Sequence, residues 1–123
     1  THYGARFRHT PFGADGPEAW RAVAERDLAA CRLVASGDGE GLLRRQDELA
    51  PTMCGRFPAA LLAALARRRG WSGQTVGHYR SDQAEQAQAG QWPGGLAMAA
   101  PDREGAGEGF VSYAAIRFTV PEN

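Results

Sequence analysis

The sequence contains no lysine, only one isoleucine (Ile116) and only two cysteines among its 123 residues. All 14 basic residues are therefore arginine. They balance 14 acidic residues, so the formal net charge is zero. Because no global positive field attracts phosphates, nucleic-acid binding is not expected. The bias toward arginine and alanine indicates a GC-rich bacterial gene and carries no functional information of its own.

Long apolar runs are also missing. No segment approaches the roughly 20 residues of a membrane span, and no signal-peptide pattern opens the chain, so no membrane partner is expected. Cys31 and Cys54 do not form a dense disulfide framework, so we expect both thiols to be reduced in a cytoplasmic protein. The histidines and cysteines lack metal-ligand spacing, and neither a metal nor another cofactor is predicted.

Large apolar side chains are scarce as well. Leucine, isoleucine, valine and phenylalanine together supply 20 of the 123 residues, which is below the roughly 20 % at which folding becomes doubtful for highly charged chains. Since the net charge is zero and the apolar periodicity is clear, the sequence predicts a folded domain with a thin core. A thin core is often completed by a partner chain, so a homo-oligomer is expected.

Four segments have the signals of helices. Apolar residues recur at helical spacing from Trp20 to Val34, after Pro17 at a first helical position and before Gly37 as a C-cap. A second helical segment ends before Pro51. A third ends in a run of three arginines, where positive charge favours a helix C-terminus, and a fourth, polar segment begins after Ser81 as its N-cap. The helices are predicted over residues 17–36, 42–49, 57–69 and 81–89.

Strands are indicated where apolar and polar residues alternate. The clearest alternation predicts a strand over residues 110–120, and weaker patterns predict strands over residues 2–9, 74–80 and 96–100. Together these elements predict an α+β fold: a small, mostly antiparallel sheet of about four strands with three to four helices packed on one face. The length fits a single domain over residues 1–123.

Cys54 is the first candidate catalytic residue. It lies at the predicted start of the Leu-rich helix, next to Arg56, where the helix dipole and the guanidinium both favour a thiolate. His78 lies on the following strand and is placed to meet that helix end. Cysteine hydrolases pair a cysteine at a helix start with a histidine on the adjoining sheet. The alternative is that both residues have only structural roles, with Cys54 as a partly buried thiol and His78 as a surface histidine.

Arginines on the predicted strands form the second candidate site. Adjacent strands would bring their guanidinium groups within reach of a carboxylate or phosphate, and aromatic residues would wall a pocket beside them. The alternative is ordinary pairing of arginine with glutamate on an exposed sheet face. The residues of this surface are Arg6, Arg8, Trp71, Tyr79, Arg80, Trp92 and Arg117.

Two functions from different classes follow. The first is a small binding or interaction module that holds a small anionic ligand or a partner protein on the Arg/Trp-lined sheet surface. The alternative is a small cysteine-dependent hydrolase or transferase, with Cys54 as nucleophile and His78 as base. A third hypothesis makes Thr1 a nucleophile activated by its own amine, if Thr1 is the native N-terminus.

Overall fold

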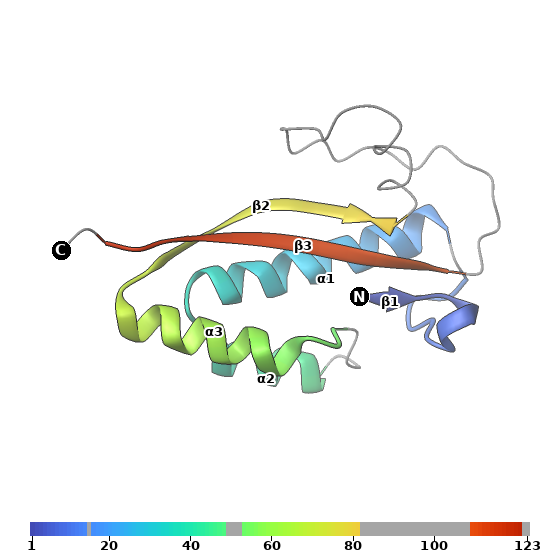
Figure 1. Ribbon diagram of the computed structural model, residues 1–123. Coiled ribbons are helices and arrows are strands. Elements are labelled where there is room, and N and C mark those ends of the chain that lie inside the picture. Colours follow the sequence, from blue (N-terminus) through green and yellow to red (C-terminus); the bar gives the residue numbers. More distant parts are fainter. Residues whose placement is uncertain (15, 49–52, 82–108, 122–123) are drawn as a thin grey trace, which may run out of the picture.

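Three helices lie on one side of a three-stranded antiparallel sheet (Figure 1). The structure, a computed structural model, describes residues 1–14, 16–48, 53–81 and 109–121. This part of the chain confirms the predicted α+β class, and none of its helices is long and apolar enough to cross a membrane. Its elements are β1 (His2–Tyr3), a 3-10 turn η1 (Ala5–Phe7), α1 (Pro17–Ala35), α2 (Gly39–Glu48), α3 (Arg56–Arg69), β2 (Ser72–Arg80) and β3 (Phe110–Thr119).

The three helices follow their sequence signals closely. Pro17 occupies the first position of α1, and α3 ends at Arg69 before the capping residue Gly70, whose positive φ of 69° suits glycine. The start of α2 differs from the prediction, because the helix begins at Gly39 rather than at residue 42. Asp38 explains the earlier start, since its Oδ1 accepts a hydrogen bond from the Gly41 N–H at 2.8 Å and so satisfies a free donor of the first turn.

The strand predicted over residues 2–9 is wrong beyond its first two residues. Gly4 and His9 exchange backbone hydrogen bonds, 2.8 Å from the Gly4 nitrogen and 3.2 Å from the His9 nitrogen, so the chain reverses over η1. Positive φ angles of 117° at Gly4 and 52° at Arg8 make this reversal possible. Except for Ser81, the residues predicted as helix 81–89 and strand 96–100 lie outside the described residues.

β3 is the central strand of the sheet, with β1 and β2 antiparallel on its two sides. Side chains alternate across β3: Phe110 and Ser112 are buried toward α1, whereas Tyr113 and Arg117 are exposed on the outer face. α1 contacts both long strands, and α2 and α3 pack on each other and on α1. Figure 1 shows this order of layers.

The apolar interior consists of two clusters rather than one large core. Tyr3, Trp20 and Phe110 dominate the first, near β1. The second lies between α1, α2 and α3, where Leu42 is fully buried and the other buried members are alanines and Val34. One face of α3 adds to neither cluster, and the oligomerisation expected from the thin core stays a prediction. The exposed large apolar residues of α3 are Phe57, Leu61, Leu62 and Leu65.

Gly73 lets β2 approach α1 closely, and we expect Gly73→Ala to lower the free energy of unfolding by about 1–3 kcal/mol. A Cβ atom at Gly73 would lie 2.6 Å from Cα and 2.7 Å from the carbonyl oxygen of Ala35. Because these are backbone atoms of α1, the helix and the strand must separate. Urea denaturation followed by circular dichroism measures the change.

Gly77 on the same strand is the matched control. A Cβ atom there would contact only the Ala115 side chain, at 4.0 Å. Gly77→Ala is therefore expected to leave stability unchanged or to raise it by up to about 1 kcal/mol, through a less flexible unfolded chain. Equal losses in the two variants would contradict the close packing of β2 on α1.

Candidate functional site

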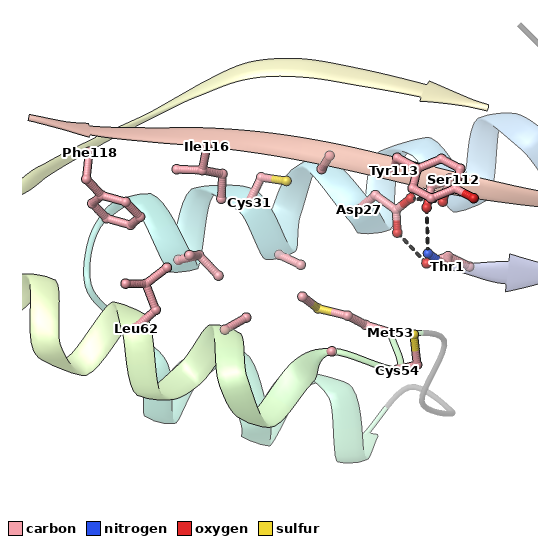
Figure 2. A pocket seen from close by; sticks show the side chains of 15 residues that line it. Thr1, Asp27, Cys31, Met53, Cys54, Leu62, Ser112, Tyr113, Ile116 and Phe118 are labelled. Atoms are coloured by element: carbon pink, nitrogen blue, oxygen red, sulfur yellow. Dashed lines mark hydrogen bonds between the residues drawn. The ribbon is translucent and has the colours of Figure 1, made fainter. Parts of the chain in front are cut away.

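A cavity of about 350 Å³ lies between α1, β3 and the start of α3. Its walls are mainly apolar, and they include Val34, Ile116 and Phe118. Figure 2 shows Phe118 and Leu62 at one end of the cavity, with the polar groups gathered at the other end. The cavity lies beside the second apolar cluster, to which Val34 belongs and against which Ile116 and Phe118 pack.

Four side chains that lie far apart in the sequence meet at the polar end. Asp27 of α1 is their centre: Thr1 Oγ1 donates to its Oδ1 at 2.5 Å, and His78 Nε2 of β2 lies 3.0 Å from its Oδ2. The Ser112 hydroxyl of β3 donates to the same Oδ2. The backbone also joins here, because the Thr1 nitrogen donates to the Ser112 carbonyl at 3.0 Å. The cluster therefore ties α1 to β2, to β3 and to the residue directly before β1. Figure 2 shows the contacts of Asp27 with Thr1 and Ser112.

The carboxyl group of Asp27 is held in its ionised form. Burial alone raises its pKa, but the hydrogen bonds from His78, Ser112 and Thr1 lower it by more, so the net pKa lies below the ordinary value. An ionised carboxylate only accepts hydrogen bonds, so His78 donates through Nε2.

His78 is fixed by more than this hydrogen bond. Its ring stacks on Trp20 of α1, with centroids 5.2 Å apart and planes 4° from parallel. The side chain is buried, and His78 Nδ1 has no hydrogen-bond partner among the described residues. His78 thus positions Asp27 through the hydrogen bond to Oδ2, and the His78 ring is itself held by its packing on Trp20.

Cys54 lies in the turn directly before α3, where the sequence placed it. It is exposed and lines the cavity together with Cys31, which is buried on α1. Burial raises the pKa of the Cys31 thiol, and the negative charge of Asp27 adds to this rise. His78 hydrogen-bonds to Asp27 and does not line the cavity, so the structure does not bring the predicted Cys54 and His78 together.

The predicted arginine surface is distributed over several elements. Arg6 lies in η1 with its guanidinium 5.8 Å from the centroid of the Phe7 ring, and Arg8 follows η1. Arg80 of β2 faces α1, where it lies 5.2 Å from the centroid of the Trp20 ring. Arg117 lies on the opposite face of the sheet and donates to Gln74 Oε1 at 2.9 Å.

The aromatic members of that surface are divided in the same way. Trp71 packs on Phe118, with ring centroids 6.5 Å apart, and Tyr79 stacks on Tyr113 of the neighbouring strand at 5.3 Å. Trp92 lies outside the described residues. Among the residues that the structure describes, no group of three or more histidine, cysteine or acidic side chains could hold a metal ion.

Sequence reasoning missed Asp27, Ser112 and Trp20 as site residues, although two of them carried a signal. Asp27 interrupts the apolar stripe of α1 between Ala24 and Cys31, and Ser112 interrupts the apolar face of β3. A polar residue on a buried face needs a hydrogen-bond partner. The chain matches no family model and no curated protein, so the geometry of this site carries the functional argument.

Proposed function

We propose that this chain is a binding module for a small, mainly apolar molecule that occupies the cavity between α1, β3 and the start of α3. The observation that carries the proposal is the cavity itself, with its mainly apolar walls and one polar end formed around Asp27. Small-molecule sites commonly have volumes of roughly 300–1,000 Å³ and combine apolar walls with a few fixed polar groups. The cavity has both properties.

The hydrogen bonds at the polar end do not form the catalytic pair of Cys54 and His78 that the sequence predicts. A hydroxyl or thiol nucleophile needs a base within hydrogen-bond reach. In the described part of the chain, Cys54 does not bond to His78, because His78 donates to Asp27 instead. The proposal keeps the binding module predicted from the sequence and places its ligand in the cavity instead of on the dispersed arginines.

Binding of a homologous series of alkan-1-ols, from butan-1-ol to octan-1-ol, tests the proposal by calorimetry. Burying each methylene group contributes about 0.8 kcal/mol, so the dissociation constant is expected to fall about fourfold per added methylene. The series should level off when the chain fills the available length. Absence of binding by every alcohol would overturn the proposal.

A pair of neighbouring alanines locates the site. Both alanines are exposed, but Ala114 lines the cavity, whereas Ala115 lies on the outer face of the same strand and does not line it. Ala114→Leu is therefore expected to weaken alkanol binding at least about tenfold by filling the space, while Ala115→Leu leaves it unchanged. Equal effects of the two substitutions would place the bound alcohol elsewhere and contradict the proposal.

A further inference from the structure

One hydrogen-bond position of Asp27 remains open at the cavity. A carboxylate oxygen accepts two hydrogen bonds. Oδ2 is filled by His78 and Ser112, whereas Oδ1 accepts only from Thr1 among the described residues. The Asp27 side chain is 13 % exposed, and it lines the cavity. A ligand can therefore reach Oδ1 without displacing any of the hydrogen bonds already present.

Asp27 is the only charged side chain that lines the described walls of this cavity, and the Thr1 ammonium group at the same end already donates to the Ser112 carbonyl. Arg26, the neighbouring residue on α1, interacts electrostatically with Asp27, but its guanidinium lies 4.7 Å from the centroid of the Phe12 ring and is not part of the cavity wall. Arg80 lies over Trp20 and Phe110 in the first apolar cluster and is not part of the cavity wall. A carboxylate oxygen with an open position accepts a hydrogen bond more strongly from a charged donor than from a neutral one, and it forms no hydrogen bond with an anion.

We infer that the ligand carries a protonated amine, which donates a hydrogen bond to Asp27 Oδ1 while its hydrocarbon part lies against Ile116 and Phe118. This inference rests on the proposed function and specifies its ligand class. The distribution of groups supports an amphiphilic ammonium ion, because the carboxylate and the apolar walls occupy opposite ends of the cavity (Figure 2). The anionic ligand expected from the sequence would meet Asp27 as a like charge.

Three ligands with the same chain length test the inference: octylammonium, octan-1-ol and octanoate, titrated into the full chain at pH 7 by calorimetry. A hydrogen bond to a charged donor is stronger than one to a neutral donor, so octylammonium is expected to bind about tenfold tighter than octan-1-ol. Octanoate should bind about tenfold more weakly than the alcohol. If octan-1-ol or octanoate binds as tightly as octylammonium, the amine assignment is overturned.

The failure of the two proposals is distinguishable. If none of the three compounds binds, the cavity is not a ligand site and the proposed function fails. If all three bind equally, the cavity stands and only the amine assignment fails. Because this ranking is measured on the unmodified chain, it does not depend on whether any variant folds.

An isosteric substitution assigns the preference to Asp27. Asp27→Asn removes the charge and retains the shape, so octylammonium and octan-1-ol are expected to bind equally well to it. Asp47→Asn is the control, because the Asp47 side chain is 72 % exposed and lies 3.9 Å from Arg56, outside the cavity wall. It should keep the tenfold preference. An unchanged preference in a folded Asp27→Asn protein would overturn the inference.

Discussion

Asp27→Ala is expected to lower the free energy of unfolding by about 3 kcal/mol at neutral pH. The substitution removes the acceptor shared by Thr1, His78 and Ser112, and it leaves a buried imidazole and a buried hydroxyl without their partner. Because Asp27 joins α1 to β2 and β3, the loss affects the main contact between helix and sheet. Urea denaturation followed by circular dichroism measures the change.

Asp47→Ala provides the matched control. The Asp47 side chain is exposed, and its ion pair with Arg56 spans 3.9 Å. Exposed ion pairs contribute little, so this substitution is expected to change stability by less than about 0.5 kcal/mol. If both alanine variants lose the same free energy, Asp27 is not the structural centre of the polar cluster.

Acid titration separates the ionised carboxylate from simple loss of packing. The folded pKa of Asp27 lies below its unfolded value, so the unfolded chain binds more protons, and stability rises with pH in this range. The contribution of Asp27 is complete above the unfolded aspartate pKa of about 3.9 and is lost as pH falls through the folded pKa. The free energy of unfolding, measured from pH 6 to pH 2, should therefore fall less steeply for Asp27→Ala than for the wild type.

The helices were predictable because their signals are local. Capping residues and apolar spacing over one or two turns fix where a helix begins, which is why Pro17 and Gly70 mark the observed ends of α1 and α3. The strand prediction over residues 2–9 was wrong because contacts outside the local pattern decide the conformation of this segment. Its alternation was genuine, but a glycine with positive φ and a backbone bridge to His9 closed the segment into a turn.

The site was less predictable, because it depends on contacts between distant segments. Residues 27, 78 and 112 meet only after α1 packs on the β2–β3 pair, and no local pattern specifies that meeting. Cys54 was placed correctly at the start of α3, since a helix start is a local feature. The predicted contact between Cys54 and His78 is not formed, since His78 faces α1 and pairs with Asp27 instead.

Leu42→Ala is expected to have an effect of similar size, with a loss of about 3 kcal/mol in the free energy of unfolding. Leu42 is 0 % exposed in the second apolar cluster, whose other members include Ala30, Ala60 and Ala63. Small side chains reach only a short distance into the space left by an isobutyl group. A void therefore remains, and the cost includes lost contacts as well as lost burial.

Leu61→Ala isolates this packing effect. Leu61 lies on α3 and is 73 % exposed. Replacing it with alanine changes the helix propensity by the same amount as Leu42→Ala does, but it removes no buried side chain. We expect a change of less than about 0.5 kcal/mol by urea denaturation. Because the cluster around Leu42 includes Val34, which also walls the cavity, Leu42→Ala should weaken octan-1-ol binding while Leu61→Ala leaves it unchanged. Equal stability in both variants would show that α2 does not pack into the core through Leu42.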